Sequence, residues 1–190
     1  NSAIETQQLV NEFNQKRIAE NKTAIRLGFG VHTGMMILGI IGDNKRRQAG
    51  VISSEINTVS RMEGLNKLFG TTIIISENTL SNIKNLLDYN YRFLAKVQVK
   101  GQEGVISIYE FFDGDLKENI EVKVQSQDDF NKGLEAYFQK DFITAAGHLK
   151  KVLELNPNDT TAERYLKNAA KLIVNGVSED WTGVERMTSK

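Results

Sequence analysis

Several residue types are absent or rare in this sequence, and each shortage excludes a class of site. The 190 residues include no cysteine, which excludes disulfides, thiolate metal sites and a cysteine nucleophile and fits a reducing cytosol. Only two histidines occur, His32 and His148, and they share no ligand spacing that would indicate a zinc site. The single proline, Pro157, lies where a C-terminal helix is expected to end.

Excess charge and long hydrophobic runs are also missing. The 24 basic residues balance the 24 acidic ones, so a nucleic-acid or anionic-membrane surface has no global electrostatic support. No apolar run approaches the length of a membrane span, and the polar start NSAIETQQ is not a signal peptide. We expect a cytoplasmic protein without nucleic-acid or direct membrane contact, any membrane anchor lying outside this stretch.

The hydrophobic pattern up to Phe112 alternates between helix and strand periods. It predicts helices over residues 2–19, 55–69 and 77–87, and strands within residues 24–31, 35–43, 71–76 and 91–112. The strands before residue 43 are expected to form a pair around the turn at His32–Gly34, and the last stretch a hairpin joined at Lys100–Gly104. This order predicts an α+β fold or a mixed α/β sandwich.

Composition changes after residue 113. Residues 114–128 are charged and poor in large apolar groups, which is typical of a linker. Residues 129–190 are strongly helical, with breaks at Lys140–Asp141 and at residues 156–159. This tail resembles one tetratricopeptide repeat plus a helix, through Ala136, Tyr137, Asp141, Phe142, Ala145, Leu149 and Pro157. Two interpretations stay open: a helical hairpin packed on its own protein or a dimer mate, or an independent protein-binding groove.

The helix EINTVSRMEGLNKLFG carries an unusual polar pair. Its apolar residues recur every three positions from Ile56 to Leu68, which predicts the buried stripe. Asn57 and Arg61 lie off that stripe, four residues and therefore one turn apart. A solvated polar face is the simplest interpretation of such a pair. The preceding GFGVHTG matches neither the dinucleotide fingerprint nor a P-loop.

Four segments, taken together and in order, are more specific than any one of them. IRLGFGVHTG, LGIIGDNKRR, VISSEINTVSRMEGLNKLFGTTIIISENTL and VKGQEGVISIYEF follow one another without gaps. Together they resemble the class III adenylate/guanylate cyclase catalytic domain, over about residues 1–113. The resemblance implies the C-terminal half of a ferredoxin-like α/β sandwich of the class III cyclase type, followed by the small all-α, tetratricopeptide-like extension.

The resemblance assigns roles to four residues. It implies that Asn57 orients the ribose and that Arg61 contacts the phosphorus under attack, which suits phosphoryl transfer because this chemistry depends on positioning and charge neutralisation. Lys100 is a candidate for the triphosphate, although an exposed turn lysine explains it equally well. Gly50 stands where the family usually has a polar residue that helps to select the base, and it has no side chain to do so.

The family's two metal-binding aspartates precede the first helix, and this sequence does not contain them. The family reaction needs Mg²⁺ or Mn²⁺, so the resemblance implies that these metals belong to the full-length enzyme and that this chain alone binds none and is inactive.

The expected parent is a homodimeric cyclase that converts ATP, with GTP as the second choice, to the 3′,5′-cyclic nucleotide and pyrophosphate. The alternative is a degenerate cyclase fold kept for dimerisation or regulation, with the tail binding a protein.

Overall fold

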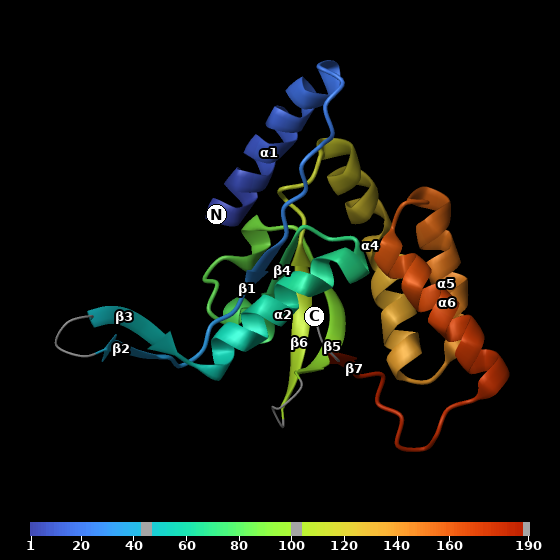
Figure 1. Cartoon of the computed structure of the whole chain (residues 1–190). Coiled ribbons are helices and arrows are strands. Elements are labelled where there is room, and N and C mark those ends of the chain that lie inside the picture. The colour runs from blue at the N-terminus through green and yellow to red at the C-terminus, as the bar shows by residue number, and fades with distance from the viewer. Residues whose placement is uncertain (43–46, 100–103, 188–190) are drawn as a thin grey trace.

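The computed structural model describes residues 1–42, 47–99 and 104–187 of the chain. Its centre is a five-stranded sheet in the order β1-β4-β6-β5-β7 (Figure 1). The strands are β1 (Phe29–Val31), β4 (Ile73–Ser76), β6 (Val105–Phe111), β5 (Tyr91–Val99) and β7 (Glu185–Met187). The pairs β1–β4 and β5–β7 are parallel, whereas β4–β6 and β5–β6 are antiparallel. The fold is therefore mixed α/β, as the sequence pattern predicts.

A separate hairpin, β2 (Ile37–Gly42) with β3 (Arg47–Ile52), projects away from this sheet (Figure 1). The prediction that the strands on either side of His32–Gly34 pair with each other is wrong. β1 pairs with β4 instead, and β2 pairs with β3, a strand that the sequence pattern does not predict. The local pattern could not distinguish these arrangements, because the partner of β1 lies more than 40 residues away.

Apolar side chains cover both faces of the sheet. On one face, Ile73, Ile75 and Phe111 form a small core with residues of α1 (Ser2–Ala19), α3 (Glu77–Leu80) and the 3₁₀ helix η1 (Leu86–Asp88). α1 matches the predicted helix, whereas the predicted helix 77–87 is only a single α turn followed by η1. On the other face lies the larger core, which α2 (Ser54–Phe69) shares with the C-terminal helices.

α2 begins and ends where the sequence predicts. The Ser53 hydroxyl accepts the Glu55 N–H at 3.1 Å as the N-cap, and Gly70 follows the last turn with φ +67°. The predicted stripe is partly wrong, because Ile56 and Leu68 are 42% and 38% exposed. The buried positions are Thr58, Met62, Asn66 and Phe69. Spacings of four and three residues follow the 3.6-residue turn more closely than a strict spacing of three.

The C-terminal part consists of α4 (Lys117–Phe138), α5 (Phe142–Leu155) and α6 (Thr160–Asn175), with breaks at the predicted positions. Residues 117–128, which composition predicts to be linker, form the first half of α4 instead. Their charged residues are compatible with a helix because Lys123 and Ser126 lie on its buried face. The tetratricopeptide resemblance and the division at residue 113 stay predictions.

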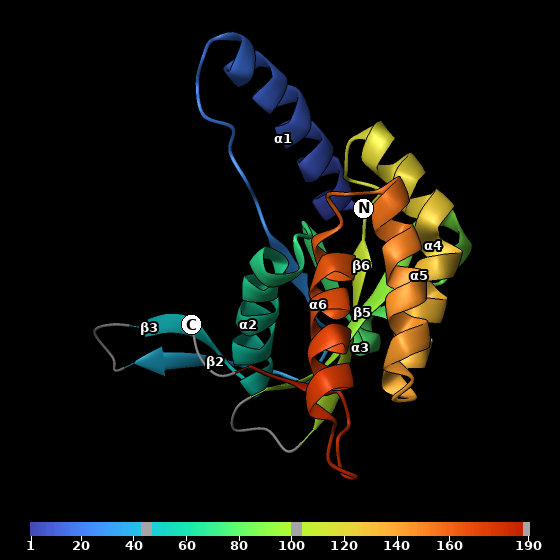
Figure 2. The same ribbon diagram turned by 90° about the vertical axis from the view of Figure 1, so that its right-hand side faces the viewer.

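The C-terminal helices share the core of the sheet: α4 contacts β5, α6 contacts α2, and α5 packs on α4 and α6 (Figure 2). Phe130, Leu134 and Tyr165 share one buried cluster with Met62 of α2 and Leu94 of β5. The sequence-level alternative of a hairpin packed on its own protein therefore describes this arrangement. Within the described ranges, no helix combines the length and apolarity that crossing a bilayer requires.

Candidate active site

The first turn of α2 is tied to the loop that follows β1. The Ser53 hydroxyl donates to the Met35 carbonyl at 2.8 Å, so the N-cap residue also fixes the chain that enters β2. The His32 ring bridges two elements, with Nδ1 2.8 Å from the Ser76 hydroxyl and Nε2 2.5 Å from a Glu55 carboxylate oxygen. Its side chain is only 2% exposed. His32 is therefore a buried link between the first turn of α2 and the end of β4.

Glycines allow β1 to run directly against α2. A Cβ at Gly30 would lie 2.7 Å from the Val59 carbonyl oxygen and 2.8 Å from the Glu63 amide nitrogen. A Cβ at Gly28 would meet the Glu63 carboxylate at 2.7 Å. The side chain of Asn66 donates to the Phe29 carbonyl at 3.1 Å across this contact. The Gly-Phe-Gly sequence therefore serves helix–strand packing, which fixes α2 against the sheet.

Asn57 and Arg61 lie on the part of α2 that this packing leaves open. Asn57 is exposed and Arg61 is half-buried, whereas their neighbours Thr58 and Met62 are fully buried. The helical rise places the two residues about 6 Å apart along the axis, on nearly the same face. An amide and a guanidinium at this separation can hold two adjacent polar groups of one ligand, such as a hydroxyl and a phosphate.

The other two predicted site residues are less informative. Gly50 is half-buried in β3, opposite Gly39 of β2, in the strand that leads into α2. Lys100 lies outside the described residues. The structure thus brings Asn57 and Arg61 together on α2 and puts Gly50 in the adjoining hairpin.

The described residues do not fit a metal centre. Among residues 1–42, 47–99 and 104–187, no three His, Asp or Glu side chains gather closely enough to hold an ion. In the first turn of α2, the carboxylate of Glu55 is already paired with His32.

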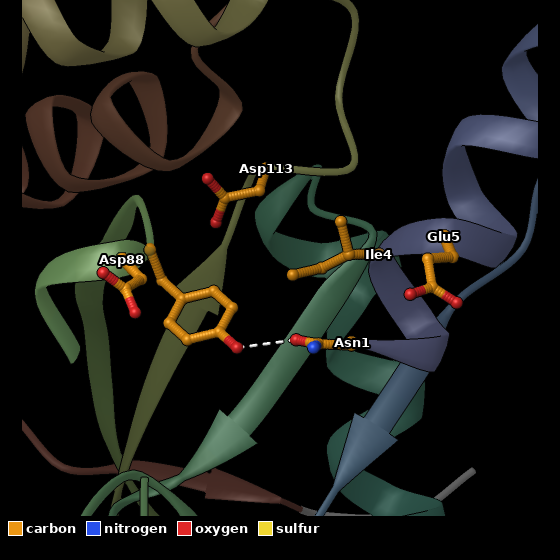
Figure 3. A pocket seen from close by; sticks show the side chains of 6 residues that line it. Asn1, Ile4, Glu5, Asp88 and Asp113 are labelled. Atoms are coloured by element: carbon orange, nitrogen blue, oxygen red, sulfur yellow. Dashed lines mark hydrogen bonds between the residues drawn. The ribbon is translucent and has the colours of Figure 1, made fainter. Parts of the chain in front are cut away.

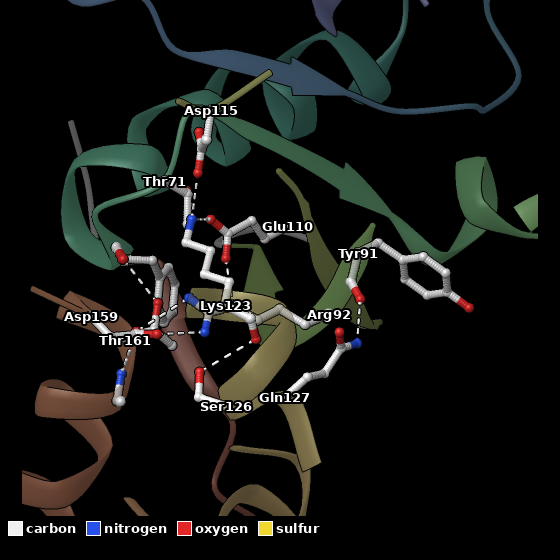
Figure 4. Close-up of polar contacts among 12 residues, drawn as sticks. Thr71, Tyr91, Arg92, Glu110, Asp115, Lys123, Ser126, Gln127, Asp159 and Thr161 are labelled. Carbon is white, nitrogen blue, oxygen red and sulfur yellow. Dashed lines mark hydrogen bonds and ion pairs between the residues drawn. The ribbon is translucent and has the colours of Figure 1, made fainter. Parts of the chain in front are cut away.

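Several charged groups with shifted pKa values lie between the sheet and the C-terminal helices (Figure 4). Arg92 bonds Glu110 at 2.6 Å and Asp159 at 2.6 and 3.2 Å, and Lys123 bonds Glu110 and Asp115, each at 2.6 Å. We call these five residues the buried ion network. Sequence reasoning missed it, although Glu110 falls in phase with the buried Ile108 of β6 and with Phe112, which directly follows the strand.

Burial and pairing oppose each other in this network. Burial alone would lower the pKa of Arg92, but the carboxylates of Glu110 and Asp159 raise it. Burial would likewise raise the pKa of Asp159, but Arg92 holds it below the ordinary value. Burial would lower the pKa of Lys123, but the carboxylates of Glu110 and Asp115 raise it above its ordinary value. The ionised forms of Arg92, Lys123 and Asp159 are therefore the stable ones, as expected of structural residues rather than of proton-transfer groups.

Two pockets lie away from α2. One, of 210 Å³, lies between the start of α1 and η1 and is lined by Ile4, Tyr89 and Asp113 among others (Figure 3). The other, of 460 Å³, lies beside β7 and includes Tyr137 and Trp181. Asn57 and Arg61 line neither pocket.

Comparison with known proteins gives one family. The sequence model of the adenylate and guanylate cyclase catalytic domain matches residues 2–112. An adenylate cyclase of Anabaena cylindrica is 37% identical over 114 residues, which are 57% of this chain and 23% of that protein. The terminal-differentiation-specific adenylate cyclase of Dictyostelium discoideum is 26% identical over 152 residues, 80% of this chain and 7% of that protein. The chain thus spans less than a quarter of either relative, 23% and 7%.

Among solved structures, the adenylyl cyclase CyaB from P. aeruginosa aligns with a TM-score of 0.47 and 25% identity. The alignment covers 60% of this chain and 56% of that chain.

Proposed function

Because the chain belongs to the adenylate and guanylate cyclase catalytic domain family, we propose that it forms part of a nucleotidyl cyclase. The reaction is the conversion of ATP, in preference to GTP, to the 3′,5′-cyclic nucleotide and pyrophosphate. The matched curated relatives are named adenylate cyclases, which supports ATP. The observation that carries the proposal is the family match over residues 2–112, which includes the open face of α2.

In this proposal Asn57 and Arg61 have different tasks. The Asn57 amide hydrogen-bonds the ribose and keeps the 3′-oxygen in line with the α-phosphate. Arg61 directs its guanidinium at the phosphoryl oxygens, where negative charge grows as the 3′-oxygen attacks and pyrophosphate leaves. Their spacing of one helical turn suits a sugar and the phosphate attached to it. Lys100 is the proposed contact to the rest of the triphosphate, and Gly50 leaves room beside the base.

A second protomer of the complete gene product is the proposed source of the remaining groups. The family uses Mg²⁺ or Mn²⁺, and we assign the metal-binding carboxylates to the part of the dimer that these residues do not supply. The β2–β3 hairpin supports a dimer contact, since Ile37, Leu38 and Ile40 of β2, and Met35 just before it, are exposed apolar groups. Apolar patches of this kind on a projecting element commonly mark protein interfaces.

The decisive test is Arg61→Ala in the complete gene product, with Lys67→Ala as the matched control. Lys67 is an exposed cation on the last turn of the same helix, so its loss changes the charge of α2 equally. We expect Arg61→Ala to lower kcat for ATP by about a thousandfold, because the contact strengthens as transition-state charge develops. Lys67→Ala should retain wild-type turnover. Equal turnover in both variants would show that Arg61 belongs to a merely solvated face.

The chain by itself should form no cyclic nucleotide with Mg²⁺ or Mn²⁺, because its described residues offer no group of metal ligands. The measurement is cyclic nucleotide formed by the purified 190-residue chain, with the complete gene product as the positive control. Reproducible turnover by the isolated chain would contradict the assignment of the carboxylates to other residues.

One alternative is supported by a specific observation. The described residues lack a metal-ligand group, and Gly50 lacks a side chain, which would suit a degenerate cyclase fold that serves dimerisation or regulation through a protein-binding tail. The two functions differ in the complete gene product: the enzyme forms cyclic nucleotide in the presence of metal, whereas the degenerate module forms none and still dimerises.

A further inference from the structure

The C-terminal helices are joined to the sheet by bonds that fix α6 in particular. Asp159 is the N-cap of α6, with one oxygen accepting the Ala162 N–H at 3.0 Å. The same carboxylate receives the two guanidinium bonds of Arg92 from β5, so the start of α6 is tied to the sheet (Figure 4). The hydroxyl of Tyr165 adds a bond of 2.7 Å to the Leu94 carbonyl of β5. These bonds therefore fix α6 to the sheet.

The first turn of α6 also contacts the last turn of α2. The Thr161 hydroxyl donates to the Phe69 carbonyl at 2.8 Å, and the two residues are 0% and 1% exposed. Phe69 is the last residue of α2, so this bond satisfies a carbonyl that has no partner within its helix. Gly70 packs closely here, since a Cβ on it would lie 2.5 Å from the Thr160 hydroxyl oxygen.

α2 is thus held at both ends, and Asn57 and Arg61 lie between the two attachments. At its start, Ser53 and Glu55 bind Met35 and His32. At its end the side-chain bond comes from Thr161, which lies 92 residues further along the chain than Phe69. A helix transmits displacement along its axis, and Arg61 is eight residues, or about 12 Å, from Phe69.

We propose that Thr161 is a positioning residue for the α2 site, and that through it the C-terminal helices set where Asn57 and Arg61 stand along the axis of α2. This inference rests on the proposed function of α2 and extends it to its control by the tail. Thr161 itself touches no substrate. Because phosphoryl transfer requires in-line geometry, a small shift of Arg61 affects the transition state more than substrate binding.

The activity test compares three variants in the complete gene product. Thr161→Val keeps the side-chain shape and removes the donor, Thr161→Ser restores the donor, and Thr160→Val makes the same change at the exposed neighbouring position. We expect Thr161→Val to lower kcat about tenfold with KM for ATP nearly unchanged, since one buried hydrogen bond and its positioning effect are lost. Thr161→Ser and Thr160→Val should stay within twofold of wild type. A kcat loss shared by all three variants would overturn the proposal.

A second readout is independent of cyclase activity. Amide hydrogen exchange of the 190-residue chain should become several-fold faster across α2 as far as Arg61 in Thr161→Val, and not in Thr160→Val. Faster exchange confined to the first turn of α6 would overturn the proposal. If Thr161→Val does not fold, Thr161→Ala replaces it in the activity and hydrogen-exchange measurements, because alanine is well tolerated in a helix.

The two tests separate this proposal from the one on which it rests. If Arg61→Ala leaves turnover unchanged, the proposed function fails, and the exchange measurement alone then decides whether Thr161 fixes α2. If Arg61→Ala abolishes turnover while Thr161→Val leaves kcat and α2 exchange unchanged, only the positioning role fails.

Discussion

Gly30 in β1 and Gly64 in α2 have opposite surroundings: the first position is crowded and the second is open. A Cβ at Gly30 would collide with the α2 backbone at Val59 and Glu63, whereas a Cβ at Gly64, within α2, would have nothing within 4 Å. We expect Gly30→Ala to lower the free energy of unfolding by about 1–3 kcal/mol through overpacking. Gly64→Ala should raise it by about 0.5–1 kcal/mol, because alanine favours a helix over glycine.

Urea unfolding of both variants measures these changes. Gly64→Ala serves as the control, since it adds the same methyl group to the same helix–strand unit. A Gly30→Ala protein as stable as Gly64→Ala would mean that β1 can withdraw from α2 without cost.

For single residues, the sequence predicted their place on a helix better than it predicted which atoms surround them in the fold. It placed Asn57 and Arg61 off the core face of a correctly bounded helix, which the 3.6-residue period makes accessible. It could not find the reason for Gly30, because the colliding atoms belong to a segment about 30 residues away. It also missed that Thr58 and Asn66 are buried, since a polar residue in the core is revealed only by its hydrogen-bond partners.

Among the elements, α4 shows how composition misleads. The charged stretch 114–128 is typical of a linker, yet α4 begins at Lys117 and buries Lys123. The carboxylates that pair with Lys123 are Glu110, in the preceding strand, and Asp115, in the turn before the helix. Composition alone cannot distinguish a lysine that stays in water from one that forms ion pairs with two carboxylates after folding.

Lys123 and Lys132 provide a matched comparison within α4. Lys123 pairs with Glu110 and Asp115 in the interior, whereas Lys132 pairs with Asp128 on the exposed surface. We expect Lys123→Met to lower the free energy of unfolding by about 3 kcal/mol, since the buried carboxylate of Glu110 and the half-buried one of Asp115 lose a partner. Lys132→Met should leave stability nearly unchanged because water and salt screen the exposed pair. Chemical denaturation of the two variants, side by side, makes the measurement, and similar midpoints would contradict a structural role for the buried ion network.

For the molecule as a whole, Asp159 predicts how stability responds to acid. Its burial would raise its pKa, but Arg92 lowers it below the ordinary value. A carboxylate with a depressed folded-state pKa stabilises the fold above its unfolded pKa of about 3.9, and the contribution is lost as pH falls through the folded value. We expect the free energy of unfolding to fall as pH is lowered below about 4.

Asp159→Asn should remove part of this acid dependence, whereas Asp128→Asn, on the exposed face of α4, is the control and should keep the wild-type slope. The measurement is urea unfolding at a series of pH values from about 3 to 6. An unchanged slope in Asp159→Asn would assign the acid sensitivity to other carboxylates.

The cyclase-like part and the C-terminal helices are expected to unfold together. One buried cluster joins Met62 and Leu94 to Phe130 and Tyr165, and the ion network crosses the same boundary, so neither part keeps its core without the other. The only tryptophan, Trp181, reports on the C-terminal part, because its ring centroid lies 5.4 Å from those of Tyr137 and Phe142. We expect its fluorescence and the hydrogen exchange of β4 to give the same urea midpoint, as a single cooperative unit requires. Trp181→Phe, followed by circular dichroism, checks that the probe itself does not create the transition. Two separated midpoints would restore the division at residue 113 and make the tail an independent domain.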